Sequence, residues 1–328
     1  MKLHQIRDLL AVAEKRSLRA AARHLGLAQP SLSRSIRALE RELGAPLLER
    51  QTRGVILTPL GELFARRAGV ATSELQRARE EIDQMQGGAR GAVTLGVSSV
   101  PLLALLPTAL PAFRKRYDGV ELRLVDGAFP AMAAGLKDGH IDFYIGVSPQ
   151  KRPAPELRVE KLFDNTRVVV ARHGHPLAGA RSLSHLTAAQ WVSTSITDDA
   201  AAEFADLFRF HGLPSPRLAA RTTGGVLGLL TLLRHSDLLA IVPKQWIECA
   251  PLRGQLSPLP LAEDIAAPPI VLVRRAALPL TPAAEHLCDL LRAASASYAG
   301  AAPSPTRTGT RRTRPTRLPS TGSRRRAR

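Results

Sequence analysis

The sequence of 328 residues predicts an α/β fold that follows a small helical domain and one long helix. Helical periodicity appears three times within residues 1–58, and one uninterrupted helical pattern fills residues 59–88. Strand-like runs then alternate with helical runs from residue 91 to residue 298. Hydrophobic residues make up 45% of the chain, which is enough to give each part its own core.

The formal charge of +18 predicts a polyanionic partner. Half of this excess lies in residues 301–328, where nine arginines occur without an acidic residue. The Pro, Ser, Thr and Arg of this segment cannot bury apolar surface, so we expect a disordered basic tail. It is either a solvated extension or an arm that binds phosphates without reading sequence. Cys249 and Cys288 form no CxxC pair and favour neither a disulfide framework nor a metal site.

The first residues are not typical of a signal peptide, because Arg7, Asp8 and Glu14 interrupt the apolar residues at helical spacing. Pro107 and Pro111 break an apolar stretch before it reaches the length of a membrane span. We therefore expect a cytoplasmic protein without a membrane partner.

Residues 1–58 contain three apolar stripes at helical spacing, and only GLAQ separates the second from the third. A short alanine-rich helix, a tight glycine turn and a longer helix form the helix-turn-helix pattern. The stripes are Leu3, Ile6, Leu10 and Val12; Leu18, Ala21, Ala22 and Leu25; and Leu32, Ile36, Leu39 and Leu43.

The third of these helices carries hydrogen-bond donors on the side that its apolar stripe leaves outside. A solvent-facing helix usually mixes charges, but acidic residues appear here only from Glu40 onward. Such a surface suits phosphates and base edges in the major groove. The candidate DNA-binding residues of this helix are Gln29, Pro30, Ser33, Arg34 and Arg37.

The segment PLLERQTRGVILT predicts a β-hairpin wing with Arg50 and Arg53 near its tip. Arg53 is then placed to reach a phosphate or the minor groove.

The stretch SLRAAARHLGLAQPSLSRSIRALERELGAPLLERQTRGVILTPLG resembles the winged helix-turn-helix signature of LysR-type transcriptional regulators along its whole length. One departure is Ala28, where the family usually has a serine or threonine that caps the recognition helix. The loss of this cap costs about 1 kcal/mol.

Residues 59–88 predict one long linker helix that starts after the N-cap Thr58 and ends at Gly87 and Gly88. Its apolar residues alternate spacings of three and four, which is a heptad seam. Nothing else in this segment can bury the seam except a copy of itself, and the resemblance implies a linker-helix dimer on an inverted repeat. The candidate dimerisation residues are Phe64, Ala71, Leu75, Ala78 and Ile82.

Residues 91–298 predict an α/β fold with largely parallel sheets. The resemblance implies a C-terminal, two-subdomain, periplasmic-binding-protein-like effector domain. Its first subdomain would comprise residues 91–162 plus 266–298, its second residues 163–265, with two crossing segments between them.

In GVSSVPLL a strand ends at Ser98 and Ser99, and a helix starts near Pro101. Ser99 is as typical of an N-cap as of a ligand contact, and the resemblance favours contact because family members use this loop for their effectors. Hydroxyls and glycines in the matching loops suggest a small carboxylated effector. The candidate effector-binding residues are Ser98, Ser99, Val100, Phe129, Pro130, Ser195, Thr197, Thr223 and Gly224.

The sequence contains no apparent catalytic constellation. Val100 replaces the second glycine of a GxSxG elbow, and His173 and His175 lack a third metal ligand nearby. No nucleotide fingerprint is present, so we expect no cofactor.

The leading hypothesis is a sequence-specific transcriptional regulator that binds double-stranded promoter DNA under the control of a small-molecule effector. The resemblance implies RNA polymerase as a partner and a homodimer or homotetramer. The alternatives are a solute-binding receptor with non-specific nucleic-acid affinity and a small-molecule enzyme with a regulatory arm.

Overall fold

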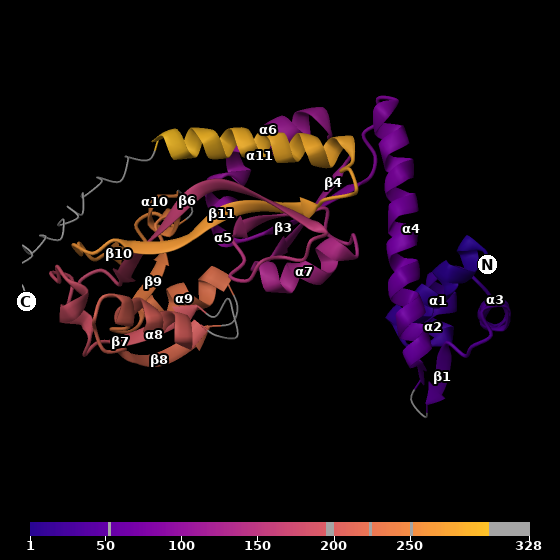
Figure 1. Cartoon of the computed structure of the whole chain (residues 1–328), viewed down its shortest axis with the longest axis horizontal. Coiled ribbons are helices and arrows are strands. Elements are labelled where there is room, and N and C mark those ends of the chain that lie inside the picture. Colours follow the sequence, from indigo (N-terminus) through magenta and orange to yellow (C-terminus); the bar gives the residue numbers. More distant parts are fainter. Residues whose placement is uncertain (52–53, 195–199, 223–224, 250–251, 302–328) are drawn as a thin grey trace, which may run out of the picture.

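The computed structural model describes residues 1–51, 54–194, 200–222, 225–249 and 252–301. A winged domain, the long helix α4 and an α/β effector domain follow one another, and α4 stands between the two domains (Figure 1). Within the described residues no helix is long and apolar enough to cross a membrane. Outside them lie the predicted site residues Arg53, Ser195, Thr197, Thr223 and Gly224, and the basic tail from residue 302 onward.

The winged domain packs three helices and a hairpin around one core. Ala28 precedes α3 without a side-chain cap, as the missing hydroxyl predicts, and Gly44 ends the helix at a φ of +67°. In α1, Leu9 is buried while Leu3 is 52% exposed. The predicted stripe was wrong there, because Leu3 opens the helix beyond the edge of the core. The elements are α1 (Leu3–Lys15), α2 (Leu18–His24), α3 (Gln29–Leu43), β1 (Leu48–Gln51) and β2 (Gly54–Leu57).

Two contacts fix the wing, which is the hairpin of β1 and β2. The carboxylate of Glu40 on α3 accepts a hydrogen bond from the backbone N–H of Leu47 at 2.8 Å. The backbone N–H of Val55 donates to the carbonyl oxygen of Arg16 at 3.2 Å. A Cβ atom on Gly54 would lie 2.6 Å from that same oxygen, so only glycine allows this approach. The wing is thereby held against α3 and the end of α1.

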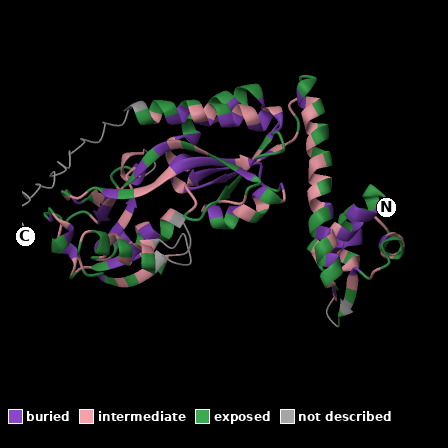
Figure 2. Cartoon of the chain, viewed as in Figure 1, coloured by how far each residue is buried: buried purple, intermediate pink, exposed green. Residues whose placement is uncertain are grey.

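Helix α4 (Pro59–Met85) begins as predicted, because the Thr58 hydroxyl accepts a hydrogen bond from the N–H of Gly61 at 3.0 Å. Gly61, Ala65 and Ala68 are buried against the winged domain. Between residues 69 and 83 no residue of α4 is buried, and this stretch is green and pink in Figure 2. Most of the predicted seam is therefore exposed.

Gly61 of α4 lies close to the residue that precedes the wing, since a Cβ atom there would lie 2.1 Å from the carbonyl oxygen of Leu47. We expect Gly61→Ala to lower the free energy of unfolding of the winged domain by about 1–3 kcal/mol, because the Leu47 backbone must move. Gly69→Ala is the matched control, because its Cβ meets nothing within 4 Å. Gly69→Ala should raise the free energy of unfolding by up to about 1 kcal/mol, because alanine has a higher helix propensity than glycine. Urea denaturation checks both variants, and equal stability of the two would contradict this packing.

The effector domain contains a seven-stranded sheet in the order β10-β6-β11-β5-β3-β4, with β9 also paired to β6, and a two-stranded sheet of β7 and β8. The strands are β3 (Ala92–Val97), β4 (Glu121–Asp126), β5 (Phe143–Val147), β6 (Leu157–Ala171), β7 (Gln190–Thr194), β8 (Arg217–Thr222), β9 (Ala240–Pro243), β10 (Ser257–Pro258) and β11 (Ile265–Arg275). The helices are α5 (Ser99–Ala104), α6 (Leu106–Arg116), α7 (Phe129–Lys137), η1 (Leu183–Leu186), α8 (Ala200–Phe210), α9 (Gly225–Arg234), α10 (Gln245–Glu248) and α11 (Pro282–Ala301).

We call the part around β3, β4 and β5 subdomain I and the part around β7, β8 and β9 subdomain II. Strands β6 and β11 run through both, because Phe163 and Ile270 join the core of subdomain I whereas Val169 and Ile265 join that of subdomain II. The pairs β3/β4, β3/β5 and β7/β8 are parallel. Strands β6 and β11 pair antiparallel with each other and with β9 and β5. The expectation of largely parallel sheets was therefore wrong, because the two crossing strands run in opposite directions.

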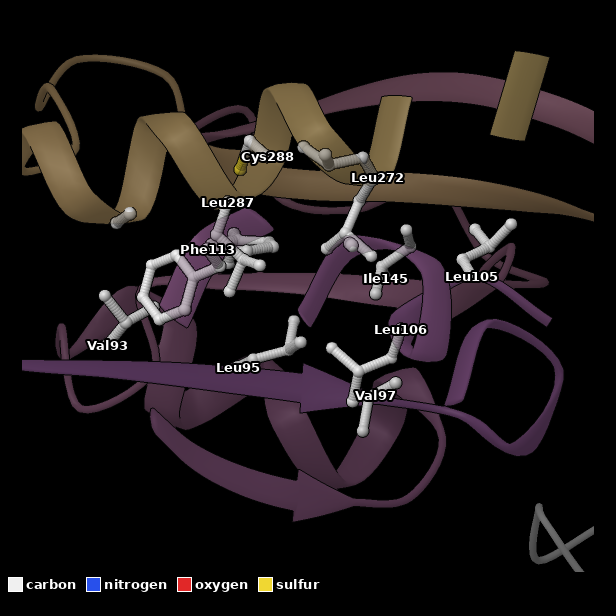
Figure 3. Packing of buried hydrophobic residues seen from close by; sticks show 14 of the residues in the cluster. Val93, Leu95, Val97, Leu105, Leu106, Phe113, Ile145, Leu272, Leu287 and Cys288 are labelled. Carbon is white, nitrogen blue, oxygen red and sulfur yellow. The ribbon is translucent and has the colours of Figure 1, made fainter. Parts of the chain in front are cut away.

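The core of subdomain I lies between its sheet and helices α6 and α11, where Phe113 and Cys288 are fully buried (Figure 3). Helix α7 covers the opposite face with a second cluster that includes Tyr144. In subdomain II, Trp191 packs edge-on against Phe208 of α8 at 5.3 Å between ring centroids. Helices α9 and α10 cover the other side. Each subdomain thus has helices on two faces, and its loops gather at the strand ends.

Candidate functional site

The outer face of α3 is a shallow hollow of about 460 Å³ lined by the five residues predicted on that helix, Gln29, Pro30, Ser33, Arg34 and Arg37. Leu32, Ile36 and Leu39 are buried on the opposite side, which turns the polar face outward. The structure therefore brings these predicted residues together on one exposed surface.

A second hollow of about 290 Å³ connects the start of α2, the start of α3 and the wing. It adds Ser17, Arg19 and Gln51 to the surface, which sequence reasoning missed. Arg19 had a usable signal, because it is a basic residue outside the buried Ala21 and Ala22 of α2. The candidate DNA interface thus extends from the recognition helix to α2 and the wing.

The interface carries positive charge, and the described part of it engages few of the arginine donors on α3. Arg34 donates one hydrogen bond, from Nη2 to the Ser31 hydroxyl at 3.3 Å, and the Arg37 side chain is exposed. The backbone of Arg50 lies on β1 opposite Val55. Guanidinium groups of this kind bind phosphates and read guanine edges in the major groove.

The predicted effector loops of subdomain I follow adjacent parallel strands. Val97 pairs with Asp126 of β4 and with Ile145 of β5, so the ends of these strands lie side by side. The loops that begin at Ser98 and at Gly127 therefore meet at one edge of the sheet. This is where ligands bind in open α/β sheets.

Ser98 and Tyr144 form a buried hydroxyl pair at this edge. The Ser98 side chain is 6% exposed, and its Oγ has no hydrogen-bond partner among the described residues. Tyr144 is fully buried and donates to the carbonyl oxygen of Val147 at 3.3 Å. Burial raises the pKa of Tyr144 above its ordinary value, and its hydrogen bond to the backbone of Val147 is among the contacts that oppose the rise. Sequence reasoning missed Tyr144 because it lies within the apolar strand β5, where its position is typical of a core residue.

The other predicted residues of subdomain I differ in accessibility. Val100 is fully buried in the core, and Phe129 is 8% exposed against the Tyr144 ring. Ser99 is half-buried and Pro130 is exposed. The Ser99 hydroxyl accepts a hydrogen bond from Nε1 of Trp246 at 3.1 Å. Only Ser99 and Pro130 reach the surface, so these two are the direct contact candidates.

In subdomain II the strands β7 and β8 are parallel and end as a pair at Thr194 and Thr222. The loops with Ser195, Thr197, Thr223 and Gly224 follow these strand ends in the sequence and lie outside the described residues. Arg167 lies on β6, opposite Ile265 of β11 and Pro243 of β9. Burial lowers the pKa of its guanidinium, and the carboxylate of Glu203 on α8 opposes this shift.

The two histidines of the RHGHP segment make hydrogen bonds that hold neighbouring loops together. Both ring nitrogens of His175 are engaged, Nε2 with the carbonyl oxygen of Asp237 and Nδ1 with the N–H of Leu177. His173 contacts the carbonyl oxygen of Gly254 and the Ser257 hydroxyl. In the part of the chain that the structure describes, no group of three His, Cys, Asp or Glu residues is placed to hold a metal ion.

Comparison with known families assigns both halves of the chain. Residues 3–62 match the family "Bacterial regulatory helix-turn-helix protein, lysR family", and residues 86–296 match "LysR substrate binding domain".

Curated relatives are regulators of the same kind. The transcriptional regulator GalR of Pseudomonas putida is 30% identical over 88% of this chain and 72% of its own length. The SDS degradation transcriptional activation protein of a Pseudomonas species is 30% identical over 88% of this chain and 95% of its own.

Among solved structures, full-length CbnR complexed with its target DNA shares the fold at a TM-score of 0.67 and 21% identity, over 90% of this chain and 100% of that one. Full-length BenM is 26% identical at a TM-score of 0.53, over 91% of this chain and 98% of that one. With a winged helix-turn-helix at its start and a substrate-binding domain over most of its remainder, the chain belongs to the LysR family of DNA-binding transcriptional regulators.

Proposed function

We propose that this regulator reads promoter DNA with the exposed face of α3 and holds the phosphates with α2 and the wing. The observation that carries the proposal is the hollow formed by Gln29, Ser33, Arg34 and Arg37 on a helix whose other side is buried. Arginine and glutamine are the side chains that pair with guanine and adenine edges. Arg19, Arg50 and Arg53 supply phosphate contacts, which fix the position of the protein without specifying sequence.

The proposed regulator acts as a homodimer, or as a homotetramer built from dimers, through α4. Leu75 is 47% exposed and Ile82 is 57% exposed, and both lie on the heptad seam with the exposed Ala71 and Ala78. Phe64 packs instead against the core of the winged domain, so it holds α4 on that domain. Two-fold pairing presents two α3 helices to an inverted repeat.

The proposed effector is a small carboxylate that binds between the subdomains, at the loops which follow β3, β4, β7 and β8. Support comes from the half-buried Ser99 and from the buried hydroxyl of Ser98 beside it. Effector binding shifts the subdomains and thereby the paired winged domains on the DNA. In the cytoplasm this changes how RNA polymerase is recruited to the neighbouring promoter.

Arg34→Ala tests the base-reading role of α3. We expect the free energy of binding to the specific site to weaken by about 1–3 kcal/mol, because one base-edge contact is lost, and base preference to flatten at one position. Electrophoretic mobility shift with specific and random duplexes measures both. The matched control is Arg41→Ala, an exposed arginine on the same helix outside the hollow, which should leave base preference unchanged. Equal losses for Arg34→Ala on specific and random DNA would refute the role.

A further inference from the structure

A hydrogen bond joins the two subdomains at the predicted effector site. Nε1 of Trp246 donates to Oγ of Ser99 at 3.1 Å. Trp246 lies on α10, which packs in the cluster of subdomain II, whereas Ser99 begins α5 of subdomain I. On another side of the same junction, the Gln150 amide donates to the Glu203 carboxylate. Trp246 is thus a residue of one subdomain that engages an effector-binding candidate of the other.

Packing fixes the indole in place. Trp246 is 6% exposed, and its cluster includes Val170 of β6, Leu229 of α9 and the partly buried Leu103 of α5. The tryptophan ring is therefore held by both subdomains. Packing therefore sets the direction of its N–H in this structure.

The direction of this hydrogen bond decides whether the Ser99 hydroxyl acts as a donor or as an acceptor toward a ligand. An indole N–H only donates, so the Ser99 oxygen is the acceptor. The hydroxyl proton of Ser99 then remains, and no second partner for it lies among the described residues. The Ser99 hydroxyl proton points away from the Trp246 N–H. The hydroxyl therefore favours a ligand atom that accepts a hydrogen bond. Hydrogen bonds to a carboxylate are the strong form of that interaction.

We propose that Trp246 is a positioning residue that orients the Ser99 hydroxyl as a donor and so makes the site selective for a carboxylate over the corresponding amide. This inference rests on the proposed effector site and deepens it. Trp246 acts through Ser99 and need not touch the effector. Its loss should therefore lower affinity for carboxylates more than for neutral amides, because the hydrogen bond to a charged acceptor is the stronger one.

The contact itself is tested on the full-length protein labelled with 5-fluorotryptophan. The chain has two tryptophans, so fluorine NMR gives two signals, which Trp191→Phe and Trp246→Phe assign. Ser99→Ala should shift the Trp246 signal and leave that of Trp191, which donates to the carbonyl oxygen of Leu186. An unchanged Trp246 signal would overturn the proposal.

Selectivity is tested by titrating the same protein with acetate, succinate and benzoate, and with acetamide, succinamide and benzamide. The wild type should bind at least one carboxylate more tightly than its amide. Ser99→Ala and Trp246→Phe should each weaken binding of that carboxylate by about tenfold, and the double variant should weaken it no further. Binding of the amide should change by a clearly smaller factor. Trp246→Phe keeps the aromatic packing, so the loss reports the N–H.

The outcomes distinguish a failure of the role of Trp246 from a failure of the proposed effector class. If Ser99→Ala weakens the carboxylate and Trp246→Phe does not, the role of Trp246 is overturned while the effector site stands. If the wild type binds every amide as well as its carboxylate, the proposed effector class fails together with this inference, and DNA binding by α3 is untouched.

Discussion

Replacing Glu74 by alanine is expected to lower the free energy of unfolding of the effector domain by about 1–3 kcal/mol, the cost of leaving a buried donor group without its partner. Glu74 lies on α4 and accepts hydrogen bonds at Oε1 from Nη1 of Arg275 and Nη1 of Arg77, each at 2.6 Å. Arg275 is 7% exposed, and its Nε and Nη2 have no partner among the described residues. Without Glu74 this buried guanidinium loses its one ion pair among the described residues.

The same cluster fastens α4 to subdomain I. Nε of Arg77 donates to the Asp142 carboxylate at 3.0 Å, and its Nη2 donates to the carbonyl oxygen of Gly139. Burial raises the pKa of Asp142, and Arg77 opposes the rise. Because α4 also packs on the winged domain, these contacts connect the effector domain with the DNA-binding domain. Glu74→Ala should therefore also weaken the effect of effector on DNA binding.

Urea denaturation followed by circular dichroism measures the loss. Glu81→Ala is the matched control, a half-buried glutamate on α4 for which the described residues show no ion pair, and it should stay within about 0.5 kcal/mol of the wild type. Glu74→Gln keeps an acceptor without the charge and should lie between the two. A wild-type stability for Glu74→Ala would show that Arg275 needs no partner.

Leu75→Glu is expected to dissociate the proposed dimer and to lower affinity for a two-half-site operator by about 100-fold or more, because linked half-sites gain that much from effective concentration. Leu75 lies in the middle of the exposed seam of α4, between Ala71 and Ile82. A pair of glutamates facing each other across a helix dimer buries two like charges. Sedimentation velocity gives the mass, and mobility shift gives the affinity.

Gln76→Glu adds the same charge to a different face of α4, where the side chain is exposed. This control should remain a dimer and keep its operator affinity. A dimeric Leu75→Glu variant would place the self-association elsewhere in the chain.

Most of the N-terminal half was predictable from its sequence. In α3 the burial of Leu32, Ile36 and Leu39 is confirmed, whereas the last residue of the predicted stripe, Leu43, is 39% exposed. The uncapped start at Ala28 and the cap at Thr58 follow from local rules and are confirmed. Strand runs such as those of β3, β5 and β9 were equally visible. The first half of β6 was not, because its exposed charged residues hide a strand whose pairing is decided by β11.

The effector site was predictable only in part. The loop at Ser98 and Ser99 has a local signal, since hydroxyls follow an apolar strand. Trp246 and Tyr144 have none, because their roles come from contacts between segments far apart in the chain. Glu74 and Arg275 are likewise 201 positions apart, and no local sequence pattern in α4 or β11 predicts that they pair.

The alternative of a solute-binding receptor does not account for the chain. A receptor has no need of a complete winged domain, and the curated relatives that span most of the chain are transcriptional regulators. The enzyme alternative is equally without support in those relatives.

Footprinting of the purified protein on the DNA upstream of its own gene, in about 150 mM salt to screen binding by the basic tail, tests the central claim most directly. The account predicts a protected interrupted palindrome, lost or redistributed in Arg34→Ala and changed by one of the carboxylates. Uniform binding that salt abolishes, with no protected site, would contradict the claim that α3 reads a promoter sequence.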